Sequence, residues 1–240
     1  MSRPYADEPS TRGLSVFTQR EFDDLIGLAH KNGMQVAVHC IGDACLDRVL
    51  ASLEKALREQ PREDHRHGIV HCQITRPEQL RRIGENHLHV YAQSIFLDYD
   101  LHIVESRAGE ELARSSYSWK TLMDLGATVS NGSDCPVEAP DVLAGIQCAV
   151  TRRDRQGRGP YLAGEAFTVR QALDSFTKWG AYASFQEHTK GRIAPGMAAD
   201  FTVLGADPFR TAPEEIQNIP VLATCLAGCP VYTRETGNRG

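Results

Sequence analysis

The sequence predicts an α/β fold made of parallel strands, followed by a smaller antiparallel β part. Through about residue 150, short apolar runs alternate with segments whose apolar residues recur at helical spacing. This repetition is typical of strand–helix–strand units, whose strands lie parallel in one sheet. The last third instead has short β-rich runs separated by turn residues, which is the pattern of antiparallel strands.

The helices are expected where apolar residues repeat every three to four positions. The first begins at Thr18, where Thr18 and Glu21 have the spacing of a capping box, and ends near Asn32. The others are expected over residues 46–59, 75–83, 119–125, 141–150 and from 168 onward. Parallel strands are expected at 35–39, 68–71, 89–93 and 128–131, with a longer connection over 94–118. Further short strands are expected at 191–196, 200–204 and 221–225.

Side chains of the kind that bind metals follow three of the four parallel strands. His39 and His71 each end an apolar run, and Asp134 comes shortly after the run at 128–131. Parallel α/β folds keep their active sites at the carboxyl ends of their strands. Two imidazoles and one carboxylate can hold Zn²⁺ and leave a position open for water. Each residue alone would more often be a hydrogen-bonded structural group, but three in series favour a shared site. A closed barrel gathers many strand ends, so we expect a (β/α) barrel rather than an open sheet.

Composition excludes several classes of function. The net charge is −5 with scattered Lys and Arg, so no nucleic-acid partner is expected. No apolar run reaches the roughly 18 residues that cross a membrane, and residues 1–5 do not resemble a signal peptide. The seven cysteines include no Cys-x-x-Cys pair, which suits a reducing, cytoplasmic location.

Three motifs in the same order resemble the amidohydrolase superfamily. They are His39-Cys40-Ile41-Gly42-Asp43, His71-Cys72-Gln73 and Gly132-Ser133-Asp134-Cys135-Pro136-Val137, and the segment 190–201 strengthens the likeness. The resemblance is to the family-3 branch, which includes N-substituted formamide deformylase-like enzymes. It implies an α/β fold with a (β/α)8 TIM-type barrel and a C-terminal antiparallel β-sandwich. It also implies hydrolysis of C–N bonds in small-molecule, non-peptide amides, with zinc or another divalent metal and one or two ions in the complete site.

The resemblance assigns roles to individual residues. His39 and His71 match the metal-binding histidines that end barrel strands 5 and 6. Asp134 matches the aspartate that ends strand 8, which lies at the metal and acts as general base. A carboxylate within hydrogen-bond reach can accept the proton of an attacking water at neutral pH.

One part of the family pattern is missing. No His-x-His pair ends a strand, because His65 and His67 precede one and His87 and His89 begin one. We expect these histidines to be solvated or packing residues. None of the five lysines ends a strand. The sequence therefore predicts only barrel strands 5–8 in residues 1–189 and a sandwich segment in residues 190–240. Such a chain would need a missing N-terminal half, or would form a homo-oligomer, to cover its open strand edges.

Two other functions remain open at this stage. The chain could be a non-catalytic remnant of the fold that lacks a full metal site. It could also use Cys40 or Cys72 as a nucleophile, although alternation along a strand points Cys40 away from His39. Among nearby residues, Asp43 is expected to cap the following helix.

Overall fold

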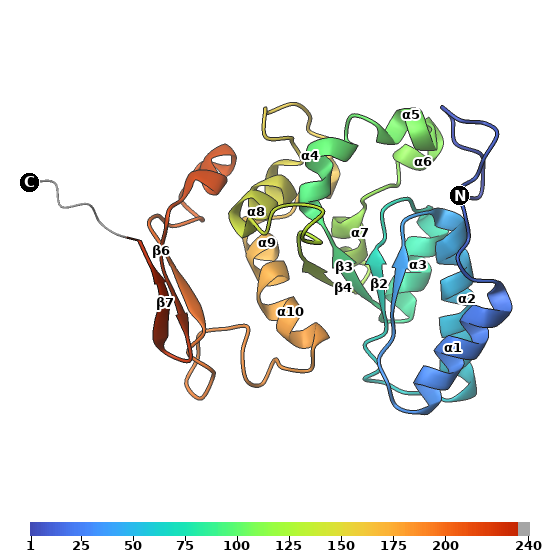
Figure 1. Cartoon of the computed structure of the whole chain (residues 1–240), viewed down its shortest axis with the longest axis horizontal. Helices are drawn as coiled ribbons and strands as arrows, with labels where there is room; N and C mark the ends of the chain where they lie inside the picture. The colour runs from blue at the N-terminus through green and yellow to red at the C-terminus, as the bar shows by residue number, and fades with distance from the viewer. Residues whose placement is uncertain (235–240) are drawn as a thin grey trace, which may run out of the picture.

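A four-stranded parallel sheet lies at the centre of the molecule, and a separate three-stranded antiparallel sheet lies at one end (Figure 1). The computed structural model describes residues 1–234. The parallel strands run in the order β1 (Ala37–Cys40), β2 (Gly68–His71), β3 (His89–Ala92) and β4 (Thr128–Asn131). The predicted parallel sheet is therefore confirmed, while the closed barrel is not seen within these residues.

Helices connect the strands and follow the expected order. They are α1 (Gln19–Lys31), α2 (Asp43–Glu59), α3 (Pro77–Glu85), α7 (Trp119–Asp124), α8 (Val142–Thr151), α9 (Val169–Phe176) and α10 (Lys178–Ala183). The predicted capping box of α1 is confirmed, since Thr18 accepts from the Glu21 amide and the Glu21 carboxylate accepts from the Thr18 amide. The connection between β3 and β4 contains short helices that were not predicted. They are η1 (Ser94–Phe96), α4 (Leu97–Asp100), α5 (Val104–Ala108) and α6 (Glu110–Ala113).

The core forms where the central strands align. Ile69, Val90 and Val129 are matched in register across β2, β3 and β4, and all three are fully buried. Burying each such side chain stabilises the fold by about 1.5–3 kcal/mol. This core fixes the register of the strands, and the register places the strand ends that carry the candidate site.

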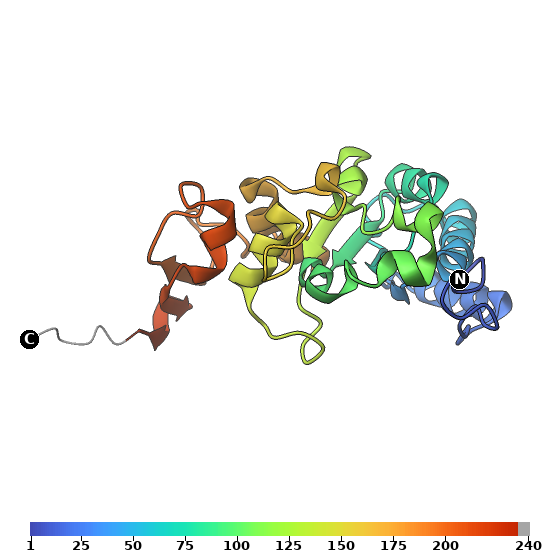
Figure 2. The same ribbon diagram turned by 90° about the horizontal axis from the view of Figure 1, so that it is seen from above.

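The C-terminal part forms an antiparallel sheet, as predicted, but its strands differ in part. The strands are β5 (Phe201–Leu204), β6 (Val221–Leu226) and β7 (Cys229–Thr233), and β7 was not expected. The strand predicted at 191–196 is wrong, because Gly191 and Gly196 have φ values of +91° and +84° and turn the chain. Between β5 and β6, η3 (Pro213–Asn218) packs against α8 and buries Ile216. Figure 2 shows this sheet at the end of an elongated molecule.

Three of the four histidines that precede or begin strands, His65, His67 and His89, are buried packing residues, whereas His87 is exposed. His67 Nδ1 accepts from the Val36 amide at 3.0 Å, so its proton lies on Nε2, which donates to His30 Nδ1 at 2.8 Å. His89 lies between the hydroxyls of Thr128 and Ser130 at 2.7 and 2.8 Å. Burial lowers the pKa of His67 to about 3 and that of His89 to about 4. These rings are therefore neutral in the folded protein at neutral pH.

We expect the free energy of unfolding to fall as the pH drops from about 6.5 to 5. The unfolded chain binds a proton on these histidines near pH 6.5, whereas the folded chain resists it down to about pH 3–4. The loss is up to about 1.4 kcal/mol per pH unit for each buried histidine. Urea unfolding at several pH values in this window, above the range of most carboxylates, measures it. The slope should be smaller in His67→Gln, and an unchanged slope would show that His67 makes no such contribution.

Candidate active site

His39 and His71 lie side by side at the carboxyl ends of two adjacent parallel strands. Their ring centroids are 4.4 Å apart and the rings are inclined by 79°. In the register of β1 and β2, His71 is paired with Cys40 rather than with His39. Regular strand geometry would therefore point the His71 side chain to the face opposite His39. Instead His71 has a φ of +72°, which rotates its side chain about the N–Cα bond toward His39. A backbone irregularity thus creates the pair.

The backbone around His71 is strained and held by neighbouring groups. Cys72 also has a positive φ, +52°, and each such non-glycine residue costs about 1–3 kcal/mol. Trp119 Nε1 donates to the His71 carbonyl at 2.9 Å, and the Tyr117 amide donates to the Gln73 carbonyl at 2.7 Å. These bonds hold the loop after β2 in the conformation that presents His71 to the site.

Gln93 fixes the orientation and tautomer of the His71 ring. Gln93 Nε2 donates to the Tyr91 carbonyl at 3.0 Å, so its Oε1 faces His71 and accepts from Nδ1 at 2.8 Å. His71 therefore carries its proton on Nδ1, and the lone pair on Nε2 is free. Burial is the main cause that lowers the pKa of His71, with the nearby His39 adding to it, whereas the Gln93 hydrogen bond acts in the opposite direction. A neutral imidazole held by a second-layer hydrogen bond is the form that binds metals.

Replacing Gln93 with leucine should lower the pKa of His71 further, because the hydrogen bond that favours its protonated form is lost. An NMR titration of the His71 ring protons measures this shift. The exposed Gln156 provides the control, and Gln156→Leu should leave the His71 titration unchanged. A rise in the His71 pKa in Gln93→Leu would contradict the assigned tautomer.

Asp134 lies on the loop after β4, where the sequence placed it, and its side chain is exposed. It has a φ of +54°, a left-handed conformation that Asp adopts more readily than most residues. Its carboxylate is near enough to His71 to favour that ring's protonated form. However, within residues 1–234 no three His, Cys, Asp or Glu side chains are arranged to hold a metal ion. The structure therefore brings the two histidines together and leaves Asp134 outside a three-ligand cluster. Two neighbouring imidazoles are side chains of the chemistry that can supply two ligands to a metal ion.

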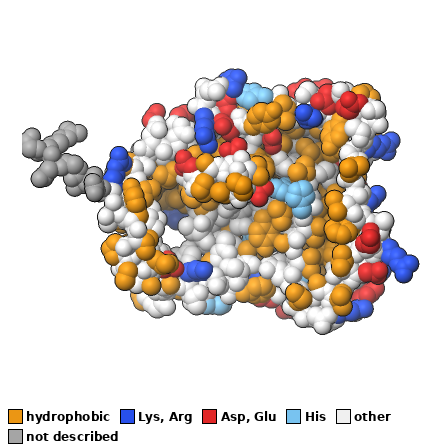
Figure 3. Space-filling model, in the orientation of Figure 1, with side chains coloured by type: hydrophobic (Ala, Val, Ile, Leu, Met, Phe, Trp, Pro, Cys, Tyr) orange, Lys and Arg blue, Asp and Glu red, His pale blue; other side chains and the backbone are white. Residues whose placement is uncertain are grey.

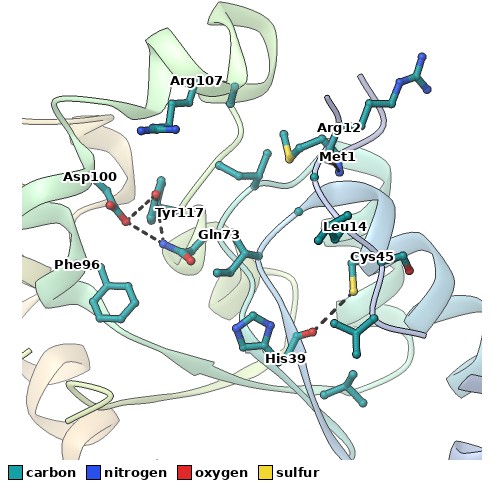
Figure 4. A pocket seen from close by; sticks show the side chains of 18 of the residues that line it. Met1, Arg12, Leu14, His39, Cys45, Gln73, Phe96, Asp100, Arg107 and Tyr117 are labelled. Atoms are coloured by element: carbon teal, nitrogen blue, oxygen red, sulfur yellow. Dashed lines mark hydrogen bonds between the residues drawn. The ribbon is translucent and has the colours of Figure 1, made fainter. Parts of the chain in front are cut away.

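A cavity of about 1010 Å³ opens beside His39. It lies between β1, α1, the N-terminal segment and the connection after β3, and most of its lining is apolar. Figure 3 shows the hollowed face, where histidine surface lies among hydrophobic surface. Figure 4 shows His39 on one side of the cavity and Gln73, Asp100 and Tyr117 on another. The cavity can receive a largely apolar small molecule beside the histidine pair.

Two other expectations are answered by the structure. Asp43 does not cap α2, because Gly42 is the capping residue. The buried Asp43 carboxylate instead accepts from the Ser2 amide at 2.8 Å and pairs with Arg76.

The two candidate nucleophiles, Cys40 and Cys72, are both 1% exposed. The pKa of Cys40 lies well above its usual value, through its hydrogen bond with Cys45 and through burial. Burial raises the pKa of Cys72 to about 12. Neither thiol is ionised at neutral pH, which opposes a cysteine nucleophile.

Gln93 and Trp119 support the site, and our interpretation of the sequence assigned them no role. Gln93 follows β3 directly, and a polar residue at the end of a third parallel strand could have indicated that it belongs to the site. Trp119 lies far from His71 in the sequence, and nothing in the local pattern indicated its hydrogen bond.

A model of the amidohydrolase family matches residues 1–232, and this chain belongs to that family. It is 35% identical to the putative amidohydrolase YtcJ of Bacillus subtilis, over 98% of this chain and 44% of YtcJ. It is 28% identical to the N-substituted formamide deformylase of Arthrobacter pascens, over 92% of this chain and 41% of that protein.

The fold comparison agrees with the sequence comparison. The crystal structure of an uncharacterized metal-dependent hydrolase from Pyrococcus furiosus aligns with a TM-score of 0.71 and 31% identity, covering 82% of this chain and 39% of that one. The chain therefore spans less than half the length of these relatives. The family resemblance predicted from the motifs is confirmed, and the sheets are those of part of an amidohydrolase fold.

Proposed function

We propose that this chain is part of a metal-dependent hydrolase that cleaves C–N bonds in small, non-peptide amides. The observation that carries the proposal is the pair of imidazole rings at adjacent strand ends, with His71 fixed by Gln93 so that Nε2 is free. Family membership supports it, because two similar proteins are described as a metal-dependent hydrolase and as an N-substituted formamide deformylase. His39 and His71 would hold the ion, for which zinc is our first choice.

The residues of this chain would share the remaining work. A bound divalent ion would polarise the substrate carbonyl and make water a better nucleophile. Asp134 would accept the proton of the attacking water and deliver it to the leaving nitrogen. Its exposed position after β4 leaves the carboxylate open to solvent. The apolar cavity would hold the amide near the histidines and exclude bulk water.

We also propose that a further polypeptide segment, corresponding to the unmatched part of the relatives, adds a strand beside β1. Within residues 1–234, β1 pairs with β2 alone, and Ala37 and His39 are exposed. Apolar side chains near this open side are also exposed, including Leu14 at 100% and Val16 at 85%. At the other edge of the sheet, α9 and α10 pack against β4. An added strand would begin to close a barrel and could supply the missing ligands.

Light scattering tests how that open edge is covered. If the proposal holds, the isolated 26.5 kDa chain associates weakly, and co-expression with the unmatched part of YtcJ yields a stable one-to-one complex. A tight dimer of the chain with itself would favour a homo-oligomer instead. If the chain is a monomer at all concentrations and does not bind the added segment, both the added-strand proposal and the homo-oligomer are contradicted.

The domain division and the compartment follow from the same proposal. Residues 1–189 would be the half-barrel and 190–240 the sandwich segment, of which residues 235–240 lie outside the described part. All seven cysteines are free, which supports a reducing, cytoplasmic location. None of the helices within residues 1–234 is long and apolar enough to cross a membrane.

Metal binding tests the proposal directly. Titration calorimetry with Zn²⁺ should show one site in the wild type, and His39→Ala or His71→Ala should weaken it at least about tenfold. His188 is an exposed histidine outside the site, and His188→Ala is the matched control. Zn²⁺ binding that survives both site substitutions would contradict the assignment. Hydrolysis of N-formyl and N-acyl amines, with Zn²⁺ and with a chelator, then tests the activity.

A second function is favoured by one specific observation. Because residues 1–234 contain no three-residue metal cluster, the chain could be a non-catalytic scaffold of the fold. It would then show no turnover at any metal loading, either alone or with the segment that covers β1.

A further inference from the structure

We propose that Gln73, Asp100 and Tyr117 form a recognition site for a protonated amine within the cavity. We call these three residues the polar corner. The inference deepens the proposed function: the amide substrate would carry an amino group that binds the polar corner, while its scissile bond lies near His39 and His71. The corner itself comes from the loop after β2 and from the connection between β3 and β4, so no additional chain is needed to form it.

The hydrogen bonds of the polar corner leave acceptors free. Asp100 Oδ2 accepts from Gln73 Nε2 and from the Tyr117 hydroxyl, each at 2.9 Å. Within residues 1–234, Asp100 Oδ1 accepts no hydrogen bond. Gln73 is 4% exposed, and its Oε1 is buried without a hydrogen-bond partner among the described residues. A buried acceptor left unpaired costs free energy, which a donating ligand can recover after a small rotation of the amide.

The charge of the polar corner also favours a cation. No Lys, Arg or His in the described part of the chain forms a salt bridge with Asp100. Burial raises the pKa of Asp100, and the carboxylate of Glu138, which also lines the cavity, acts in the same direction. Arg107 also lines the cavity, but its side chain is exposed and faces Asp7 at 3.8 Å. A bound ammonium group would supply the missing positive charge and three donors.

The surroundings of the polar corner define the rest of the ligand. Phe96, Ile103 and Val104 line the same cavity, so the amine should carry an apolar or aromatic group. Phe96 also stacks on His71, with ring centroids 5.9 Å apart and an interplanar angle of 23°. Phe96 therefore lines the same cavity as the polar corner and also contacts the histidine pair. A substrate that spans Phe96 would have its amine at Asp100 and its amide at His71.

Titration calorimetry with two probes of the same shape tests the inference. Benzylamine is protonated at pH 7.5 and benzyl alcohol is neutral, and both are titrated into the whole chain in the presence of a chelator. The wild type should bind benzylamine about tenfold more tightly or better, the effect of one charge-assisted hydrogen bond. Asp100→Asn should remove this preference and leave the affinity for benzyl alcohol unchanged. Equal binding of the two probes, or binding of neither, would overturn the proposal.

Two further variants make the test specific. Asp98 lies on the same short helix, faces Arg155 and does not line the cavity, so Asp98→Asn should keep the preference for benzylamine. Tyr117→Phe should reduce the preference in part, and it serves as the second variant if Asp100→Asn does not fold. If Tyr117→Phe and Asp98→Asn behave alike, the polar corner is not the amine site. The amine titrations are made without metal, so their failure would not contradict zinc binding by His39 and His71. Equally, an absence of zinc binding would not contradict amine binding at the polar corner.

Discussion

Replacing Trp119 with alanine is expected to lower the free energy of unfolding by about 3–5 kcal/mol. Trp119 is 1% exposed and is among the largest fully buried side chains of the described residues. Its loss leaves a cavity in the core and removes the Nε1 hydrogen bond to the His71 carbonyl. The strained conformation of residues 71 and 72 then loses one of its supports. Urea unfolding followed by circular dichroism measures the change, because fluorescence depends on the two tryptophans themselves.

Trp119→Phe separates packing from the hydrogen bond. Phenylalanine keeps most of the apolar contact but leaves the His71 carbonyl without its donor, so we expect a loss of about 1–3 kcal/mol. We also expect a changed NMR signal for the His71 ring, because its backbone is no longer held. Trp179 lies in α10 and is only partly buried, so Trp179→Ala should cost less than Trp119→Ala. Equal losses in the two alanine variants would contradict the role given to Trp119.

Gly84 is the second position where a large effect is expected. It is buried in α3, and an added Cβ would lie 2.5 Å from the Leu125 carbonyl oxygen and 2.9 Å from Leu125 Cβ. Because the nearest atom belongs to the backbone, α3 or the end of α7 must move. Gly84→Ala should therefore destabilise the protein by about 1–3 kcal/mol, despite the better helix propensity of alanine.

Gly27 provides the matched control for this prediction. It also lies inside a helix, α1, but an added Cβ there meets nothing within 4 Å. Gly27→Ala should stabilise the protein by about 0.5–1 kcal/mol, because alanine restricts the unfolded chain and favours the helix. Thermal and urea unfolding of the two variants side by side should give opposite signs. If both variants stabilise the protein, the close approach of Leu125 does not constrain the fold.

Most elements of the first 151 residues, apart from the short helices between β3 and β4, were predictable because their signals are local. Gly68–His71 and Thr128–Asn131 form strands at the expected residues, and the Thr18 capping box starts α1 where expected. Apolar periodicity and helix capping act within a few residues, so a window of sequence contains them. The prediction for residues 191–196 failed because this stretch was interpreted as one of several short strands, whereas two glycines with positive φ turn the chain there.

The candidate site was predicted in part. His39 and His71 were named from their places at strand ends, and the structure brings their rings together. The role of Asp134 stays a prediction, since its charge acts on His71 but it completes no metal cluster within the described residues. Gln93 and Trp119 were not identified as supports, because their contacts join segments distant in sequence.

By itself the sequence determined the amidohydrolase family and the order of the parallel strands. It also identified His39 and His71 as candidate site residues at the ends of their strands. Motifs and hydrophobic periods encode these, because they depend on residue type and short spacing. Tertiary structure alone decided that the His71 side chain turns toward His39, that Gln93 orients its ring and that Asp100 faces the cavity without a cation. Those features depend on a backbone torsion and on contacts across the sheet, and both arise only when the core has packed.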